Sequence, residues 1–274
     1  MPCVNLTLPS SLELVDSYAL AYQKNLTNVY YKGNMTTYLN IWFKYRNPMI
    51  EGKYFYMLDS NGNVEYDGKR YSLLEEIIIP DGTIKIGSHQ FAGFNGITNI
   101  TIPASVKQMD VGAFNLSRTD SFNVYFNGTL LDWVSITFEY SQYNPVSEYN
   151  KNFTENFHIL DENGDVEYNG NRYTLLKDLV IDNSIVRIKN YQLSKFMFNT
   201  ITIENTYLII QYNAFDKQPD DTVVYYYGTE HQWEVYLKKY AYHLGKNIYY
   251  YSETRPTTAG NYWHYVDDVP TMWE

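Results

Sequence analysis

The repeat unit of this chain is plainest in residues 79–114, which read IPDGTIKIGSHQFAGFNGITNITIPASVKQMDVGAF. Short β-prone runs in this segment end at a proline or a polar residue, and similar runs continue outward in both directions. Their starts are evenly spaced, with 23 residues from Glu76 to Asn99 and 24 residues from Asn99 to Asn123. A constant period of this length is typical of a solenoid in which each turn adds one strand to a parallel sheet.

A longer repeat is superimposed on this short one. The segment NVYFNGTLLDW (123–133) returns as VVYYYGTEHQW (223–233), and MLDSNGNVEYDGKRYSLL (57–74) returns as ILDENGDVEYNGNRYTLL (159–176). Repetition on two scales predicts an α/β repeat protein, a solenoid with parallel β rungs. Because a solenoid presents long regular faces, its default function is binding.

The pattern inside a rung predicts which side chains face the core. Ile100 and Ile102 should lie on the inner face of the rung 99–103, with Thr101 on the outer face, and Pro103 should end the strand. Large apolar residues also recur in the middle of each repeat. We expect them to form a buried column, and they are Phe91, Phe114, Leu193 and Phe215.

Residues 79–114 resemble the BspA-type leucine-rich repeat, whose units read roughly I-P-x-S-V-x-x-I-G-x-x-A-F-x-x-C-x-x-L-x-x-I-x-I-P. The matching positions are Ile79-Pro80, Ile86-Gly87, Phe91, Ile97, Ile100, Ile102-Pro103, Val106 and Gly112-Ala113-Phe114. Phe94 or Asn95 stands where the family has a cysteine. The last residues, 249–274, resemble the closing module of such proteins in gut bacteria. The resemblance implies a leucine-rich-repeat solenoid at the cell surface or outside the cell.

Two inserts, near 34–75 and 129–177, interrupt the predicted rungs. Each should begin with a helix, over 36–45 and 129–138, and Thr129 with Asp132 three residues later forms a capping-box pattern. The Asn47-Pro48 and Asn144-Pro145 pairs should end these helices. Trp42 and Trp133 lie on the apolar stripes, where they either seal the helix against the solenoid or form a platform for stacking on sugars.

A β-meander of three short antiparallel strands should follow each helix. In the first insert its strands are FYMLD, NVEYD and KRYSLL. Asn61-Gly62 and Asn163-Gly164 predict hairpin turns with positive φ, and Asp67-Gly68 and Asn169-Gly170 predict second turns. The third long unit lacks the meander, and IYYYSE with NYWHYVDD should form a β-hairpin cap over the last rung. We therefore expect a solenoid over 1–249 and a cap over 250–274.

Composition excludes several functional classes. The 274 residues carry a net charge of −10, which disfavours binding to nucleic acids and anionic membranes. Cys3 is the single cysteine, so neither an intrachain disulfide nor a cysteine-based zinc site is expected. No transmembrane segment or signal peptide is visible. Because Met1-Pro2 leads into the middle of a repeat, we expect an excerpt of a longer chain, or a mature piece behind an added Met, from which an export signal could have been lost.

The sequence carries no motif for catalysis, a cofactor or a metal. The five histidines are scattered, and there is no nucleophile elbow, P-loop or dinucleotide-binding pattern. The turns at Asp59 and Asp161 suggest calcium, but their glycine is in the wrong position for an EF-hand loop, and a hairpin turn explains the same residues. We therefore predict that the protein is not an enzyme, with no catalytic, cofactor-binding or metal-binding residues.

The 30 tyrosines allow two interpretations. They could be a half-buried consensus position multiplied by the repeat, or a binding surface, because tyrosine offers a large contact area at low entropic cost. The binding interpretation places ligand residues on the outer sheet face, beside Thr101 and Thr202. The candidates are Tyr125, Tyr226, Tyr227, Tyr249, Tyr250, Tyr251 and Trp263.

These observations predict a non-catalytic surface or secreted binding module. The family resemblance implies adhesion to a host matrix protein or to other cells, so the expected partner is a protein or glycan on a host or neighbouring cell. Two alternatives stay open at this point. One is a structural spacer within a larger surface protein. The other is a carbohydrate-binding module in which Trp263 and the tyrosine clusters stack on sugar rings, and exposure of Trp133 and Trp233 would favour it over simple packing.

Overall fold

The computed structural model describes residues 4–17, 19, 25–44, 54–116, 121–139, 144, 146, 156–241, 243–244 and 247–273. Contacts divide the chain into two compact units, Met1–Ser141 with Pro145–Thr174, and Gln142–Asn144 with Leu175–Glu274. Cys3 and the predicted helix stops at Pro48 and Pro145 lie outside the described residues.

Parallel rungs form the main sheets of the first unit. The strands β1 (Asn5–Leu8), β3 (Asn28–Tyr31) and β5 (Tyr54–Leu58) pair in order, as do β8 (Glu76–Ile78), β10 (Asn99–Pro103), β12 (Asn123–Asn127) and β14 (Phe157–Leu160). A second row pairs β2 (Leu14–Val15) with β4 (Trp42–Phe43), and β9 (Lys85–Ile86) with β11 (Gln108–Asp110) and β13 (Thr137–Glu139). The predicted solenoid with parallel rungs is confirmed.

The second unit repeats this arrangement. Its main sheet runs through β17 (Asp178–Ile181), β19 (Thr200–Ile203), β21 (Val223–Tyr226), β22 (Asn247–Tyr251) and β23 (Tyr262–Val266), all parallel, and closes with antiparallel β24 (Val269–Met272). The short strands β18 (Arg187–Ile188) and β20 (Ile209–Ile210) pair beside it. The hairpin cap is therefore β23 with β24. The predicted hairpin of β22 with β23 is wrong, because the intervening segment returns β23 parallel to β22. The domain boundary at 249/250 falls inside β22 and stays a prediction.

Polar side chains at the rung starts hold the rungs in register. Asn28 donates to the Asn5 side chain at 2.8 Å, Asn99 donates to Glu76 at 2.7 Å, and Asn123 donates to Asn99 at 3.0 Å. A hydrogen bond of this kind contributes roughly 0.5–1.5 kcal/mol net. A slip of one residue in the strand register would turn every inner side chain outward. These polar ladders, the rows of side-chain hydrogen bonds at the rung starts, oppose such a slip.

The interior consists of the predicted inner positions and mid-repeat aromatics. Phe91 and Phe114 are fully buried and stack with centroids 5.4 Å apart in the first unit. Leu193 and Phe215 are buried in the second unit. Phe94, at the position of the family's cysteine, is also buried, 4.6 Å from the ring of Phe55. The predicted burial of the mid-repeat residues is confirmed within each unit.

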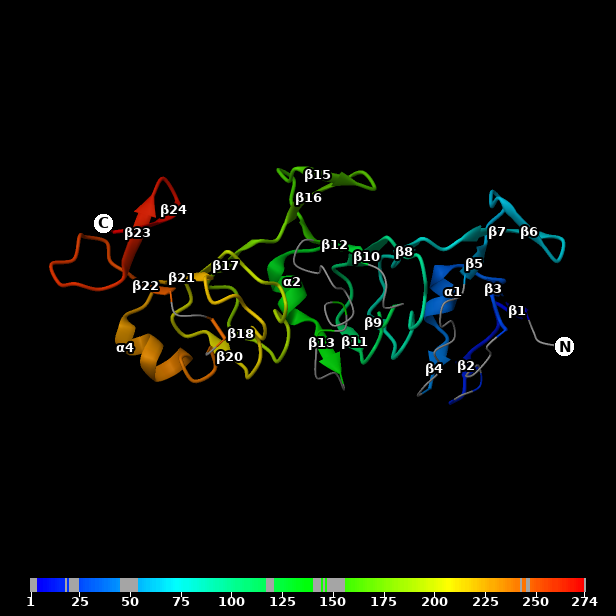
Figure 1. The fold of residues 1–274 in the computed structure, drawn as a ribbon, viewed down its shortest axis with the longest axis horizontal. Helices are drawn as coiled ribbons and strands as arrows, with labels where there is room; N and C mark the ends of the chain where they lie inside the picture. The colour runs from blue at the N-terminus through cyan, green and yellow to red at the C-terminus, as the bar shows by residue number, and fades with distance from the viewer. Residues whose placement is uncertain are drawn as a thin grey trace. The chain divides into compact units, whose positions relative to one another are not determined.

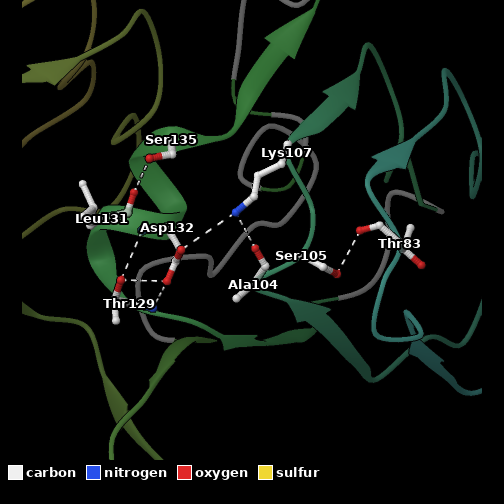
Figure 2. A network of polar contacts seen from close by, with 8 residues as sticks. All are labelled: Thr83, Ala104, Ser105, Lys107, Thr129, Leu131, Asp132 and Ser135. Carbon is white, nitrogen blue, oxygen red and sulfur yellow. Dashed lines mark hydrogen bonds and ion pairs between the residues drawn. The ribbon is translucent and has the colours of Figure 1, made fainter.

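The helices begin where predicted and end earlier. They are α1 (Met35–Leu39), α2 (Leu130–Ser135) and α4 (Glu230–Gln232), the last continued by a π-helical turn over Trp233–Leu237. The Thr129 hydroxyl accepts from the Asp132 backbone and the Asp132 carboxylate accepts from the Thr129 backbone, which confirms the capping box. Figure 2 shows this cap beside Lys107. The Lys107 ammonium group lies 3.9 Å from the Asp132 carboxylate and donates a hydrogen bond to the Ala104 carbonyl at 2.8 Å.

Early helix ends change the environment of one tryptophan. After α1, Trp42 lies in strand β4 between the buried neighbours Ile41 and Phe43, so alternation turns it outward with 63% of its surface exposed. Of the two interpretations of Trp42, sealing a helix is therefore wrong, and its exposure is compatible with a platform for stacking. Trp133, inside α2, is fully buried as predicted, and Trp233 is buried too.

Each insert forms the three predicted strands, but the third strand lies between the first and the second, so the order differs from that of a simple meander. The first strands of the inserts, β5 and β14, still pair as parallel rungs with β3 and β12, but β8 and β17 after the inserts begin new sheets, so the predicted interruption of the rungs is confirmed. The hairpins are β6 (Val64–Tyr66) with β7 (Lys69–Leu73), and β15 (Val166–Tyr168) with β16 (Asn171–Leu175). Figure 1 shows each hairpin projecting from the rung sheet that it follows.

The two predicted turns of each insert differ. Asp67-Gly68 and Asn169-Gly170 have positive φ and connect their strands directly, as predicted. Asn61-Gly62 and Asn163-Gly164 do not have positive φ, so that part of the prediction is wrong. Glycine is required at positions 62 and 164 for a different reason, because a Cβ there would collide with the backbone of Tyr71 and Tyr173.

The turn at Asp59 accounts for the residues that suggested calcium. The Asp59 carboxylate accepts hydrogen bonds from the Ser72 hydroxyl and from the Asn61 backbone.

Gly164→Ala should therefore cost about 1–3 kcal/mol of unfolding free energy, because the added methyl must displace backbone. The control is Gly170→Asn, where open space and an asparagine-tolerant φ of 74° limit the expected cost to about 1 kcal/mol or less. Urea denaturation of both variants measures the difference. Equal costs would contradict the assigned role of Gly164.

Candidate binding surfaces

The hairpin of the first insert covers an outward-facing tyrosine of the rung sheet. Tyr30, on β3, lies 4.9 Å from Tyr56 on the next rung and 3.9 Å from Tyr66 on the hairpin, both stacked. Tyr71 closes the group edge-on at 5.1 Å. The Lys32–Asp67 ion pair, at 2.7 Å, ties the hairpin turn to the same rung. Tyr30 is consequently buried although it points away from the core.

The second insert repeats this arrangement around Tyr125. His158 stacks on it at 4.9 Å from the next rung, Tyr168 of the hairpin at 4.0 Å, and Tyr173 packs edge-on at 5.0 Å. Burial and the Glu76 carboxylate raise the pKa of Tyr168 to about 12, and burial lowers the pKa of His158. The stack is therefore neutral at pH 7. Tyr125 and neighbouring Thr101 are buried, so neither is available at the surface.

In the second unit Trp263 takes the place of the hairpin tyrosines. Its ring is fully buried, 5.4 Å from Tyr225 and 4.9 Å from Tyr265, and its Nε1 donates to the Tyr226 carbonyl at 3.0 Å. Register places Tyr225 opposite Thr202, on the outer face. Tyr226 lies opposite Ile203, on the inner face, and is fully buried 5.4 Å from Trp233. Among the predicted ligand residues, Trp263, Tyr226 and Tyr125 thus belong to the interior.

The other predicted residues remain accessible. Tyr227 is 43% exposed and stacks on Tyr251 with centroids 4.1 Å apart, at an angle of 18°. Tyr249 is partly exposed on the same outer face, while Tyr250 alternates to the other side of β22. Burial, with the carboxylates Glu230 and Glu234, raises the pKa of Tyr250 to about 12. We call Tyr227, Tyr249 and Tyr251 the tyrosine patch.

Trp263 packs against two rings of the tyrosine patch. It packs edge-on against Tyr251 at 5.2 Å and against Tyr227 at 6.1 Å. Tyr265 flanks the patch and donates its hydroxyl to Glu204 at 3.0 Å. Rings held in this way lose little further freedom when they bind a partner.

A groove of about 570 Å³ in the second unit carries tyrosines that the sequence analysis missed. Four tyrosine rings line it, namely Tyr207, Tyr212, Tyr236 and Tyr240. They come from a loop after β19, from the segment after β20, and from the π-helical turn Trp233–Leu237 with the residues that follow it. No motif or spacing links them, because only the turn of the solenoid brings these segments together.

A second groove, of about 600 Å³, lies in the first unit beside the exposed Trp42. Ile84 is an exposed apolar residue on its wall, and Lys85 pairs with Asp110 there at 2.9 Å. Within the described residues, no group of three or more histidine, cysteine or acidic side chains could hold a metal ion. Among the same residues, no helix is long and apolar enough to cross a bilayer.

Comparisons with known proteins identify the repeat. The sequence description of the BspA type leucine rich repeat region matches in six copies, over residues 2–55, 69–162 and 165–223. No curated protein matches the chain. Among solved structures, a leucine rich cell surface protein from Faecalibacterium prausnitzii A2-165 is similar, with 13% sequence identity and a TM-score of 0.36. The match covers 81% of this chain and spans 60% of the length of that protein.

His158 offers a test of how the second hairpin is held. Because burial lowers its folded pKa below 6.5, the unfolded chain binds this proton more readily, and stability is lost as pH falls from about 6.5 through the folded pKa. His158→Tyr copies Tyr56 of the first insert and should remove this dependence. Urea unfolding of both proteins between pH 7.5 and pH 5 measures it. The other histidines cancel in the comparison, and identical pH dependence in both proteins would contradict the assignment.

Proposed function

The chain belongs to the BspA-type leucine-rich repeat family, and from this premise we propose that it is a non-catalytic binding module at the cell surface or outside the cell. Its function is adhesion to a host matrix protein or to a neighbouring cell. The contact runs through the tyrosine patch, and Tyr250, on the other side of β22, lies outside it. The surface location follows from what the family resemblance implies.

The observation that carries this proposal is the stacking of exposed Tyr227 on half-buried Tyr251. Most outward tyrosines of the rung sheets are covered by a hairpin or by Trp263, whereas this pair retains exposed ring surface. Tyrosine is enriched at binding hot spots because its ring buries a large area and its hydroxyl forms hydrogen bonds. A rigid pair of rings supplies buried area and hydrogen bonds at a low entropic cost.

Three alternatives are weaker. A carbohydrate site built on Trp263, or on Trp133 and Trp233, loses its basis, because all three rings are buried. A passive spacer would not need an exposed aromatic pair, although the family match is compatible with one. An enzyme has no support from a motif in the sequence.

Binding of immobilised extracellular-matrix proteins and of whole cells to the purified chain tests the proposal. The variant Tyr227→Ala/Tyr249→Ala/Tyr251→Ala should weaken binding about 30-fold, which corresponds to a hot spot of about 2 kcal/mol. Tyr54→Ala, an exposed tyrosine of the first unit, should leave binding unchanged. Thermal unfolding of each variant confirms that it is folded.

The same measurement separates the alternatives. Undiminished binding by the triple variant would remove the tyrosine patch from the interaction. If the intact chain bound no matrix protein and no cell, the spacer would become the better explanation.

A further inference from the structure

We propose that the groove lined by Tyr207, Tyr212, Tyr236 and Tyr240, hereafter the tyrosine groove, binds an uncharged oligosaccharide. It is separate from the tyrosine patch and does not rest on matrix adhesion. Its residues take no part in any function proposed above, and they lie in a single unit of the chain.

One wall of the tyrosine groove is a loop held by a buried asparagine. Asn205 donates to the Ile185 carbonyl at 2.9 Å and accepts from the Tyr207 backbone at 3.0 Å. This turn directs Tyr207 into solvent, where 83% of its surface is exposed. Gln211 continues the wall, and its side chain accepts from the Asn190 backbone at 3.1 Å. The wall is therefore held in place before any ligand arrives.

The other wall is the π-helical turn over Trp233–Leu237 with the residues that follow it. Trp233 and Leu237 anchor it in the interior, and the π-type bond from the Lys238 amide to the Trp233 carbonyl, at 2.9 Å, widens the turn between them. Tyr236 and Tyr240, one turn apart, lie on the groove side, and Tyr236 is 61% exposed. Single π-type turns inside helices occur frequently at functional sites.

The lining favours a ligand that is polar and uncharged. Besides the four tyrosines it consists of Asn190, Thr206, Leu208, Ile209, Ile210 and Gln211, without a single ionisable acid or base of the Asp, Glu, Lys, Arg or His type. A charged ligand would find no opposite charge within the lining, and the net charge of −10 repels acidic ones. A purely hydrocarbon ligand would strip water from tyrosine hydroxyls and amides without replacing their hydrogen bonds.

A neutral sugar chain satisfies both requirements. The C–H faces of its rings can pack on tyrosine rings, and its hydroxyls can exchange hydrogen bonds with the phenol, amide and threonine groups. The volume of about 570 Å³ is that of an ordinary ligand pocket, for which about 300–1,000 Å³ is usual. An oligosaccharide would therefore cover the exposed tyrosine rings of the groove with groups of matching chemistry.

The test is an array of neutral and acidic oligosaccharides followed by calorimetric titration of the whole chain. Probes include gluco-, manno- and N-acetylglucosamine oligomers as neutral ligands, and sialylated and uronic-acid oligomers as acidic ones. We expect saturable binding of a neutral class, weakened at least about tenfold, or 1.4 kcal/mol, in Tyr207→Ala/Tyr236→Ala. Tyr207→Phe/Tyr236→Phe retains the rings and should bind more tightly than the alanine variant.

The control is Tyr227→Ala/Tyr251→Ala, which should bind the sugar like the intact chain. Because this variant loses matrix binding and the groove variant does not, failure of one proposal is distinguishable from failure of the other. Three results would overturn the oligosaccharide site. The first is that no neutral probe binds at about 10 mM, a concentration above a Kd of about 1 mM, which corresponds to −4.1 kcal/mol. The second is that acidic probes bind as tightly as neutral ones, and the third is that the folded variant Tyr207→Ala/Tyr236→Ala keeps its affinity.

Discussion

Every tyrosine on the rungs of this chain takes its environment from the parallel pairing of one rung with the next. Because side chains alternate across a strand, the register decides whether a ring faces the core or the outer face. Tyr225 and Tyr226 are adjacent in sequence, yet Tyr225 pairs with Thr202 on the outside and Tyr226 with Ile203 on the inside. The polar ladders at the rung starts protect this register, and all the surfaces described above depend on it.

The outer sheet face would be an aromatic surface if the hairpins did not cover it. Tyr30, Tyr125 and Tyr225 occupy equivalent outward positions, and each is buried by rings from a later segment, Tyr66, Tyr168 and Trp263 respectively. Exposed rings at these positions would otherwise invite association. The inserts of the first unit therefore protect the solenoid as well as extend it. Uncovered rings are concentrated in the second unit, where the tyrosine patch and the tyrosine groove lie.

Much of the fold could be predicted because its signals are local. The period of the rungs, the capping box at Thr129 and the turn at Asp67-Gly68 depend on neighbouring residues, and the structure confirms each. The prediction for Trp42 failed because helical and strand periodicity are hard to separate over a few residues. The role of Gly62 was also missed, since the backbone that approaches it belongs to Tyr71.

The candidate sites were harder to predict for the same physical reason. Alternation indicates that Tyr125 faces outward, but a ring 43 residues later, that of Tyr168, decides that it is buried. Trp263 resembled an exposed sugar platform in sequence and instead closes over Tyr225. The rings of the tyrosine groove come from three separate segments, so no spacing could reveal them.

The central claim is that coverage of the outer face divides the tyrosines into structural and binding groups. Nitration or iodination of the native protein, with the modified sites mapped by mass spectrometry, tests this claim most directly. The structure predicts rapid modification of Tyr207, Tyr227 and Tyr236 and protection of Tyr30, Tyr125 and Tyr225 until the protein unfolds. Modification of Tyr125 or Tyr225 in the native state as fast as that of Tyr227 would contradict it.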